Sequence, residues 1–422
     1  MNQRVLIVSP HFPPVNAPDM QRVRVSLPYF VEAGWEVTVL TVDDPTPVAP
    51  REPALSATVP AAVRVERAGC FSRRWTGWFG VGNVALRSLP FLFLAGSRLL
   101  RARRYDVVYF STTMFIVLPL GRLWKMLHGV PYVIDLQDPW VSDYYDRPGG
   151  PRPPGGWKYR FTQWQARALE GWTMRGAAHL ITVSAAYGEA LRARHAGLRQ
   201  LPATELPFGS PDPDLAHVRA TLTARPRRLP AGGWRLVFAG AIGPGMHAAV
   251  GLLFAAMAEV RRAGRPVSAH FFGTSYAPQA RPAILALAAQ YDLQDCVHEQ
   301  PDRLPYLEAL QVTLEADANL LFGSTDLAFT PSKILAVLAA GRPVLALAPA
   351  GSAMVPRLAQ LGQPCVTFAP AGPAGESVRA AAGQLLALAN GGAPRPDAAA
   401  LARYSARAVA AQQLEILAAA SR

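Results

Sequence analysis

Residues 4–42 read RVLIVSPHFPPVNAPDMQRVRVSLPYFVEAGWEVTVLTV. Two apolar, β-rich runs begin at Arg4 and Glu36, and the stretch from Met20 to Ala33 between them is long enough for a helix. A nearly continuous apolar run is typical of a parallel strand that is covered on both faces. The segment therefore predicts a βαβ unit, from which doubly wound parallel sheets are built.

The same alternation continues on both sides of a proline- and glycine-rich stretch. Further strand candidates are VRVER from Val63, DVVYFS from Asp106, YVIDLQ from Tyr132 and HLITVS from His179, followed later by WRLVFAG, VSAHFFG, CVHEQ, ANLLFG, RPVLALA and CVTFA. Helical candidates between them are 157–175, 248–263, 283–290 and 333–340. The stretches PFGSPDPD from Pro207 and TARPRRLPAGG from Thr223 predict a linker without regular structure, in which Asp212-Pro-Asp214 is a turn rather than a metal site.

A chain of 422 residues is too long for one ordinary core. We predict an α/β protein with two doubly wound, Rossmann-like domains, 1–222 and 223–397, that face a central cleft. A last helical stretch, about 398–420, follows the second sheet. Ligands of such sheets bind beyond the carboxyl ends of the strands, so the loops after strands are the places to search for a site.

Composition limits the class of protein. Half of the residues are hydrophobic and 17% are charged, which excludes a largely disordered chain. The three cysteines lie far apart and form no C-x-x-C pair, so neither a disulfide framework nor a zinc site is expected. No secretory signal pattern opens the chain, and the longest apolar stretch is shorter than the ~20 residues of a spanning helix. We expect a cytoplasmic protein that is soluble or peripheral to a membrane.

The net charge of +13 points to an anionic partner, although an arginine-rich composition also follows from a high-GC genome. The charge is concentrated between Arg73 and Arg104, where seven arginines and no acid are interleaved with Trp75, Trp78, Phe79, Phe91 and Phe93. Basic residues mixed with aromatic ones are typical of contact with an anionic membrane. The alternative is a core helix with a solvated basic face. Nucleic acid is not expected as a partner, because no recognised binding motif is present.

The loop after the first strand, Ser9 to Arg24, contains no glycine. Two prolines stiffen it, and an aspartate just before the next helix is suited to cap that helix. Arginines in the first helical turn oppose the helix dipole, so they are better placed for binding an anion than for stability. The candidate residues are Pro14, Asn16, Asp19 and Arg22. The alternative is a stiff connection with surface arginines.

A glycine loop opens the second half. FAGAIGPGMH places Gly240, Gly243 and Gly245 ahead of a helix, where backbone N–H groups can approach a phosphate. A NAD site would need an acidic residue at the end of the next strand, and SAHFFGTS has none. The pattern therefore predicts binding of a pyrophosphate but not of NAD. His247, the basic residue of this loop, and Gly273, which ends the next strand, complete the candidates.

The segment LAFTPSKILAVLAAGRPVLAL, residues 327–347, is the most specific in the chain. We predict that Thr330-Pro331-Ser332-Lys333 opens a helix, with the proline in its first turn and the hydroxyls capping it or binding a ligand. Lys333 is poorly placed for the helix dipole and well placed for a phosphate. The alternative is one more αβ unit without a binding role.

Two carboxylates follow the strand YVIDLQDPW. Asp135 and Asp138 are candidates for acid–base chemistry or for orienting an acceptor, because they stand at the carboxyl end of a strand. The alternative is that they cap the following loop.

Several of these stretches together resemble glycosyltransferase family 4. The N-terminal segment has the family's strand, Pro-Pro loop and helix, and IDLQDPW, ITVSAAYGE and PSKILAVLAAGRPVLAL fall where the family has its acceptor-side loop, a strand and its donor-binding helix. The resemblance implies the GT-B fold, in which a C-terminal helix, here 398–422, returns to the N-terminal domain. It also implies transfer with retention at the anomeric carbon, without a metal or another cofactor.

Two departures from the family pattern concern donor binding. Family members carry two glutamates at positions that correspond to Ala328 and Ala336, and the second of these binds the donor ribose. They also carry Arg and Lys on the glycine loop, where this chain has only His247. Lys333 could supply part of the missing charge.

The resemblance thus implies a hexosyltransferase-like enzyme that moves a sugar from a nucleoside diphosphate sugar to a lipid-linked or polysaccharide acceptor. In this interpretation, domain 1–222 binds the acceptor and domain 223–397 the donor, and the enzyme works at the inner face of the membrane. Two alternatives stay open: a nucleotide-sugar epimerase of the same fold, and a non-catalytic relative that binds a partner.

Overall fold

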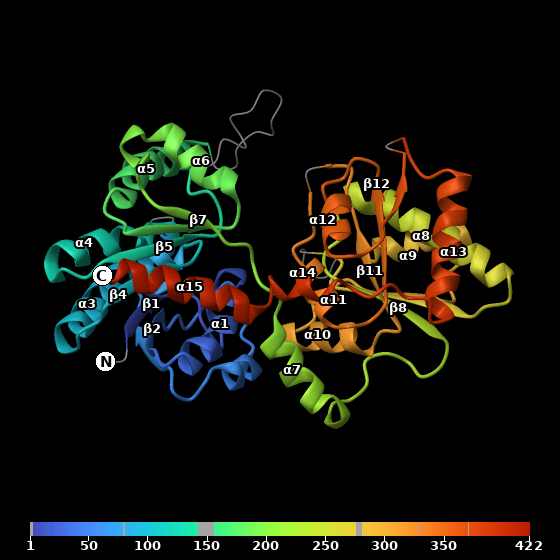
Figure 1. Cartoon of the computed structure of the whole chain (residues 1–422), viewed down its shortest axis with the longest axis horizontal. Coiled ribbons are helices and arrows are strands. Elements are labelled where there is room, and N and C mark those ends of the chain that lie inside the picture. Colours follow the sequence, from blue (N-terminus) through green and yellow to red (C-terminus); the bar gives the residue numbers. More distant parts are fainter. Residues whose placement is uncertain (1–2, 79–80, 142–155, 276–280, 328, 370) are drawn as a thin grey trace. The chain divides into compact units, whose positions relative to one another are not determined.

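The computed structural model describes residues 3–78, 81–141, 156–275, 281–327, 329–369 and 371–422. The chain divides into two compact units. Unit 1 comprises Met1–Gly209 and Ala406–Arg422, and unit 2 comprises Ser210–Ser405. Each unit contains one parallel β-sheet with helices on its two faces (Figure 1).

The described part of unit 1 has a seven-stranded sheet in the order β3-β2-β1-β4-β5-β6-β7. Its strands are β1 Arg4–Val8, β2 Glu36–Val42, β3 Arg64–Ala68, β4 Val107–Ser111, β5 Tyr132–Leu136, β6 His179–Thr182 and β7 Ala203–Glu205. All neighbouring strands are parallel. The six predicted strands are present, and the short β7 was not predicted because ATE carries no apolar run.

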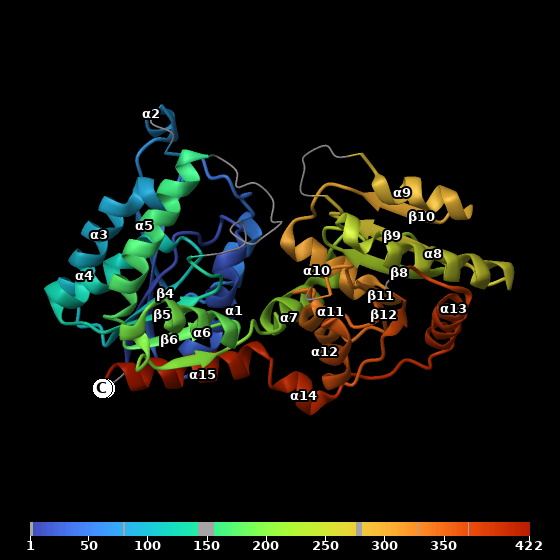
Figure 2. The ribbon, with the colours of Figure 1, turned by 90° about the horizontal axis from the view of Figure 1, so that it is seen from above.

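The two faces of this sheet are covered by different helices (Figure 2). The helices α1 Gln21–Glu32 and α15 Ala406–Ala420 pack together on one face, against Val5 and Ile7 of β1. On the other face α3 Val84–Ala102, α4 Pro119–His128, α5 Trp157–Met174 and α6 Ala185–Arg194 pack against Leu6 and Val8. Because alternate residues of a strand point to opposite faces, one apolar strand supplies both layers.

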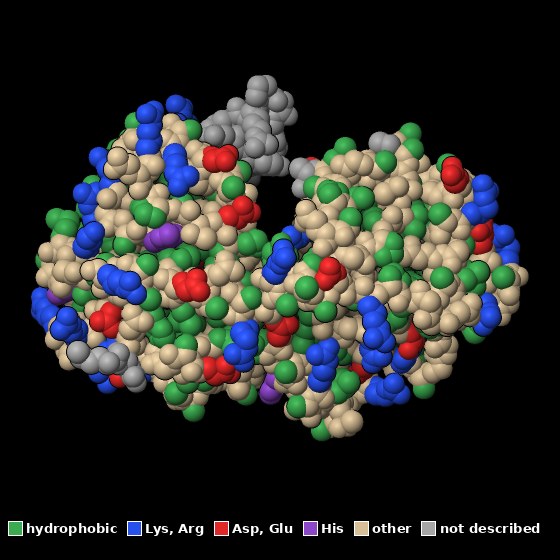
Figure 3. Space-filling model, in the orientation of Figure 1, with side chains coloured by type: hydrophobic (Ala, Val, Ile, Leu, Met, Phe, Trp, Pro, Cys, Tyr) green, Lys and Arg blue, Asp and Glu red, His purple; other side chains and the backbone are tan. Residues whose placement is uncertain are grey.

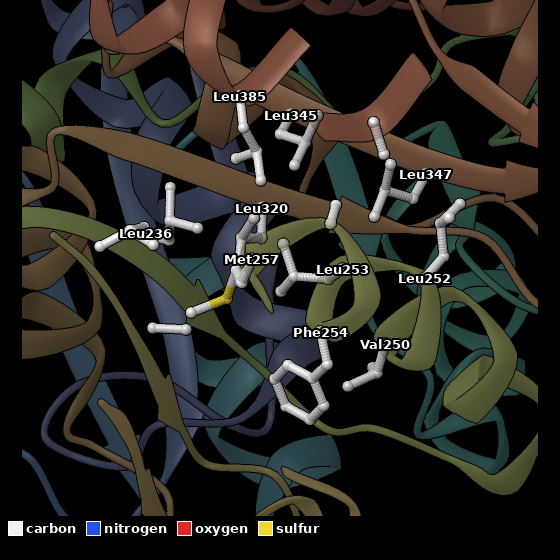
Figure 4. Close-up of a cluster of buried hydrophobic side chains, with 14 of the residues drawn as sticks. Leu236, Val250, Leu252, Leu253, Phe254, Met257, Leu320, Leu345, Leu347 and Leu385 are labelled. Atoms are coloured by element: carbon white, nitrogen blue, oxygen red, sulfur yellow. The ribbon is translucent and has the colours of Figure 1, made fainter. Parts of the chain in front are cut away.

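Unit 2 repeats the plan. Its described part has a six-stranded parallel sheet in the order β10-β9-β8-β11-β12-β13. The strands are β8 Trp234–Ala239, β9 Val267–Phe272, β10 Val297–Gln300, β11 Ala318–Phe322, β12 Val344–Pro349 and β13 Val366–Phe368, all of them predicted. The helices are α7 Asp212–Thr221, α8 His247–Arg262, α9 Ala283–Ala288, α10 Tyr306–Glu315, α11 Ile334–Ala339, α12 Met354–Gln360, α13 Gly375–Ala389 and α14 Ala398–Ala402. In the core of unit 2, leucines of β8, β11 and β12 pack against Leu253, Phe254 and Met257 of α8 (Figure 4). Charged side chains lie over the surface of both units (Figure 3).

The division between the units differs from the predicted boundaries. The structure divides the chain after Gly209 and after Ser405, whereas the sequence placed the divisions after 222 and 397. The expected irregular linker contains the helix α7, because Pro211 occupies its N-cap and Asp212 and Asp214 stand in its first turn. The predicted single helix 398–420 is two helices, and only α15 belongs to unit 1. Both boundaries differ for the same reason: α7 packs on α10 and α14 packs on α11, so these contacts place α7 and α14 in unit 2.

No helix in the described ranges is long and apolar enough to cross a bilayer.

A buried histidine gives unit 2 an expected pH dependence. His270 on β9 is 3% exposed and stacks on His298 of β10 with ring centroids 4.8 Å apart. The pKa of His270 is lowered from 6.5 to about 4, mainly by burial and to a smaller extent by the charge of His298. The unfolded chain therefore takes up a proton near pH 6.5 that the folded chain refuses until about pH 4, so stability falls as the pH drops through this window.

We expect His270 to cost unit 2 up to about 3 kcal/mol of unfolding free energy between pH 7 and pH 4. Calorimetric unfolding at several pH values should show a smaller loss in His270→Gln than in the wild type. A wild-type pH dependence that is retained in full by His270→Gln would assign the loss to other groups.

Candidate functional site

The strand orders locate the functional edge of each sheet. In unit 1 the order reverses between β1 and β4, and in unit 2 it reverses between β8 and β11. At such a reversal the loops after the two strands leave to opposite faces, and ligands bind between them. The relevant residues are therefore those that directly follow β1, β4, β8 and β11.

In unit 1 a histidine–aspartate pair occupies this place. His11, in the loop after β1, shares a hydrogen bond of 3.0 Å between its Nδ1 and Oδ1 of Asp19. Thr112, directly after β4, donates to Oδ2 of the same carboxyl group at 2.7 Å. Because the carboxyl oxygen accepts, Nδ1 of His11 carries the hydrogen and Nε2 is the remaining polar atom of the ring. Gln137 fixes the arrangement from β5 by donating to the backbone oxygen of Asp19 at 2.9 Å.

Asp19 thus differs from its predicted role. It is buried, and the N-cap of α1 has no side-chain hydrogen bond, so Asp19 does not cap this helix. Its carboxyl group instead joins the loop after β1 to the end of β4. The alternative of a stiff connection with surface arginines is also wrong, because Arg22 and Arg24 are 2% and 1% exposed.

Asp135 is fully buried. Its Oδ2 lies 3.0 Å from Nε of Arg22 and accepts a hydrogen bond from Ser111 at 2.6 Å. Arg22 also donates to the backbone oxygen of Leu206 at 2.8 Å. Burial raises the pKa of Asp135, and the charge of Arg22 opposes that rise. Asp135 and Arg22 therefore fasten α1 and the segment after β7 to the sheet, and neither side chain is open to a ligand in this structure.

Asp138 has the opposite environment. It follows β5 as an exposed residue, next to Trp140, whose ring stacks on Phe115 with centroids 5.9 Å apart. The pKa of Asp138 is raised, mainly by partial desolvation of its carboxyl group and to a smaller extent by the negative charge of Asp19. The structure thus brings Asp138 and the His11–Asp19 pair to the same edge of the sheet.

The two remaining candidates of unit 1 shape the loop. Asn16 donates to Glu52 at 2.8 Å and accepts from Gln21 at 2.8 Å. The backbone oxygen of Pro14 accepts from the N–H of Glu52 at 2.6 Å, and the peptide bond between Pro13 and Pro14 is cis. These contacts hold the loop after β1 against residues 50–52.

In unit 2 the glycine loop meets the loop after β11. Gly240 follows β8 with φ +148°, a conformation that side chains rarely adopt. The backbone oxygen of Gly245 accepts from the N–H of Thr325 at 2.9 Å. A Cβ atom on Gly245 would lie 2.5 Å from Oγ of Ser324, so a side chain there would displace this hydroxyl. Gly243 precedes the 3₁₀ turn Pro244–Met246, after which α8 begins at the exposed His247.

Lys333 points into this loop. Its ammonium group donates to the backbone oxygen of Ala239 at 2.9 Å and lies 3.1 Å from the centroid of the Phe238 ring. A Cβ atom on Gly240 would lie 2.8 Å from Nζ. Burial lowers the pKa of Lys333 well below 10.5. Among the described carboxylates none forms an ion pair with it, so a buried lysine amine stands beside the glycine loop without a carboxylate partner.

The other predicted donor residues lie around this place. Thr330 and Ser332 are exposed and Pro331 is buried, but the helix α11 begins only at Ile334, with Lys333 at its N-cap and no side-chain cap. The expectation that residues 330–333 open the helix is therefore wrong by one turn. Gly273 follows β9 with φ +69°, against Arg303. Ala336 is partly exposed on α11, and Ala328 lies outside the described residues.

Sequence reasoning missed His11, Thr112, Ser324 and Thr325. Each follows one of the two strands that flank a reversal of strand order. The sequence shows that these residues follow strands, but the strand order was not known from it.

A cavity of about 280 Å³ in unit 1 lies elsewhere. It is lined by Arg175, Arg194, His195, Ala196 and Gly197. These residues follow the carboxyl ends of α5 and α6, and in a parallel βα unit the end of the helix lies at the edge opposite the site. The cavity takes no part in the arrangement described above.

Comparisons with known proteins agree with this fold. The model of the glycosyl transferase 4-like domain matches residues 21–209. Comparison with curated proteins gives no match. Among solved structures, HepE of Anabaena in complex with UDP and glucose is similar with a TM-score of 0.56 and 16% identity, over 99% of this chain and 100% of that one.

Two other solved structures have different activities in their names. The α,α-trehalose 6-phosphate synthase of Burkholderia multivorans is similar with a TM-score of 0.58 and 12% identity, over 99% and 98% of the two chains. The UDP-GlcNAc 2-epimerase of Methanocaldococcus jannaschii is similar with a TM-score of 0.55 and 10% identity, over 99% of each chain. Identities this low establish the fold alone. The chain therefore has the GT-B fold, and its residues 21–209 match the glycosyl transferase 4-like domain.

Proposed function

We propose that the protein transfers a sugar from a nucleoside diphosphate sugar to a lipid-linked or glycan acceptor. The observation that carries this proposal is Lys333, whose buried amine lies beside the glycine loop without a carboxylate partner. A buried charge is stable only when it is paired, so such a lysine is suited to receive its counter-charge from a ligand. A diphosphate supplies this charge, and the complex of HepE with UDP and glucose supports a donor of that class.

Unit 2 has the groups that a diphosphate leaving group needs. The backbone N–H of Gly243 and the hydroxyls of Ser324 and Thr325 would bind the phosphate oxygens, while the N–H of Gly240 donates to the backbone oxygen of Phe272 at 2.8 Å. Lys333 would neutralise the charge that develops on the leaving diphosphate, which is the main electrostatic contribution such a site can make. In this role Lys333 replaces a metal, so we propose transfer without one, and a chelator should leave the rate unchanged. Retention at the anomeric carbon is part of the proposal through the family resemblance.

Unit 1 supplies the acceptor side of the proposal. Asp138 is exposed at the edge where β1, β4 and β5 end, and His11 presents Nε2 near the same edge while Asp19 holds its other nitrogen. A carboxylate and an imidazole can orient an acceptor hydroxyl and accept its proton. Asp135 would act only by positioning, because its side chain is fully buried in the ion pair with Arg22.

We expect Asp138→Asn to lower the turnover number severalfold or more and to leave donor affinity nearly unchanged. The substitution keeps the side-chain volume and removes the charge, so an interaction made only in the transition state is lost. Steady-state kinetics with calorimetric titration of the donor separates the two quantities. A fall in thermal stability that matches the loss of activity would instead assign Asp138 to loop capping.

Two experiments test the proposed function as a whole. Titration with UDP, GDP, dTDP and ADP shows whether unit 2 binds a nucleoside diphosphate and which base it prefers. Product analysis with and without acceptor separates transfer from epimerisation, which the structural likeness to the UDP-GlcNAc 2-epimerase keeps as the second candidate. Absence of binding to every nucleotide would favour the non-catalytic alternative.

A further inference from the structure

Exposed apolar side chains of unit 1 gather on one group of helices. Of the thirteen exposed large hydrophobic residues in the described part of the chain, ten lie between residues 71 and 164. They are Phe71, Trp75, Trp78, Leu86, Leu94, Leu123, Met126, Leu127, Phe161 and Trp164. Trp75 and Trp78 are 78% and 92% exposed, an unusual state for the largest apolar side chain.

Seven of these residues belong to one layer formed by α3, α4 and α5, and Phe71, Trp75 and Trp78 lie in or beside the short helix α2 Arg73–Gly77, which precedes α3 (Figure 2). The ring of Trp124 on α4 fills the space over Gly96 of α3, where a Cβ atom would lie 2.1 Å from it. Arg122 of α4 lies over the Trp172 ring of α5, 4.6 Å from its centroid. The layer is therefore continuous, and its inner side faces the sheet.

The outer side of the layer has a regular pattern on α3. Every fourth residue along one side of α3 is exposed, and residues at this spacing lie on the same side of a helix. The exposed residues are Leu86, Pro90, Leu94 and Arg98. On α5 the exposed rings of Phe161 and Trp164 lie 5.9 Å apart. On α4 the exposed side chains are those of Leu123, Met126 and Leu127. We call these exposed residues of α2, α3, α4 and α5 the α2–α5 surface.

The α2–α5 surface is basic. Its exposed cationic residues are Arg73, Arg74, Arg98, Arg101, Lys125, Arg160 and Arg167. The four helices contain one acidic residue, Glu170, which is fully buried and bonded to Arg194 and His195. Figure 3 shows Lys and Arg side chains along the edge of unit 1 at which α3 and α4 lie. One predicted arginine does not contribute, because Arg87 is buried and paired with Asp44. Phe79, also part of the predicted patch, lies outside the described residues.

We propose that the α2–α5 surface docks unit 1 on a bilayer containing anionic phospholipid. Tryptophan prefers the membrane interface, leucine and methionine enter the acyl boundary, and arginine and lysine bind lipid phosphates. A second copy of the chain would bring two basic surfaces together. Nucleic acid would match the charge but would leave Leu94, Met126 and Leu127 without an apolar partner. The proposal goes beyond the proposed transfer reaction and does not depend on it, since docking requires no nucleotide and no acceptor.

The basic and the apolar residues have separable effects. Salt weakens the attraction of the arginines to lipid, because the Debye length falls from about 10 Å at 0.1 M to about 3 Å at 1 M ionic strength. The exposed tryptophans and leucines, once inserted in the bilayer, contribute a part of the binding that salt does not remove. We therefore expect sedimentation with vesicles of phosphatidylcholine and phosphatidylglycerol, little sedimentation with phosphatidylcholine alone, and partial release at high salt.

Two variants divide the surface, and a third is the matched control. A charge variant replaces Arg73, Arg74, Arg101 and Lys125 by Gln, and an apolar variant replaces Trp75, Trp78 and Trp164 by Ser. The control replaces four exposed arginines of unit 2, Arg262, Arg265, Arg379 and Arg395, by Gln and so removes the same charge. The charge variant should bind anionic vesicles at least about tenfold more weakly, and the control should bind like the wild type. The apolar variant should be released completely by salt. Thermal unfolding checks that each variant is folded.

Three results would overturn the proposal. The first is a wild-type protein that does not sediment with anionic vesicles at low salt. The second is an equal loss of binding in the control variant, which would show an effect of net charge alone. The third is a concentration-dependent dimer, or binding to RNA, that the charge and apolar variants abolish while vesicle binding stays unchanged. A failure of the transfer reaction would not affect any of these readouts.

Discussion

Replacing Asp135 by alanine is expected to lower the unfolding free energy of unit 1 by about 3–5 kcal/mol, which is the cost of leaving a buried charge without its partner. Asp135 is 0% exposed and Arg22 is 2% exposed, so water does not screen the unpaired guanidinium. Ser111 would lose its acceptor in addition. The N-terminal location of most tryptophans provides a probe, because eight of the nine lie in unit 1, and unfolding of this unit in urea can be followed by fluorescence.

A matched control is available on the same sheet. Arg4 and Glu36 form an ion pair of 2.9 Å, but their side chains are 39% and 40% exposed. Exposed pairs contribute about 0–1 kcal/mol, so Glu36→Ala should change stability little. The double variant Arg22→Met with Asp135→Leu should recover much of the loss, since apolar residues of similar volume can replace a buried pair. Equal effects of Asp135→Ala and Glu36→Ala would contradict the structural role that we assign to the buried pair.

The second large effect is expected at Lys333. Removal of a charge-assisted contact costs about 1.5–3 kcal/mol, so Lys333→Met should weaken binding of a nucleoside diphosphate by roughly tenfold or more. Binding has a second signature, because burial lowers the pKa of Lys333 and a bound diphosphate would raise it again. The wild type should therefore take up a proton on binding at a pH above that lowered pKa. Titrations in buffers of different ionisation enthalpy measure this uptake.

The chain supplies a control for this experiment as well. Lys125→Met removes a lysine that lies in unit 1 and donates to the backbone oxygen of Gly176. It should change neither nucleotide affinity nor proton uptake. If Lys333→Met is folded and binds the nucleotide with wild-type affinity, Lys333 does not belong to the donor site.

The sequence by itself determined the architecture of both units. Twelve predicted strands are present, because most of them are short apolar runs that must be covered on both faces, and this pattern is local. The sequence also singled out Lys333 and the glycines of the loop after β8, which lie together in the structure, and their role in donor binding stays a prediction. Local patterns did not place the ends of the domains, since α7 and α14 are assigned to unit 2 by helices far away in the chain.

Only the tertiary structure decided which polar groups are buried and which are open. Asp135 and Asp138 are three residues apart and looked equivalent, yet β5 directs one into an ion pair with Arg22 and leaves the other exposed. His11 and Thr112 meet at Asp19 because β1 and β4 are neighbours where the strand order reverses. The α2–α5 surface combines helices that are separated by whole strands in the sequence. Burial and pairing are properties of contacts between distant segments, and a linear pattern of residue types does not contain them.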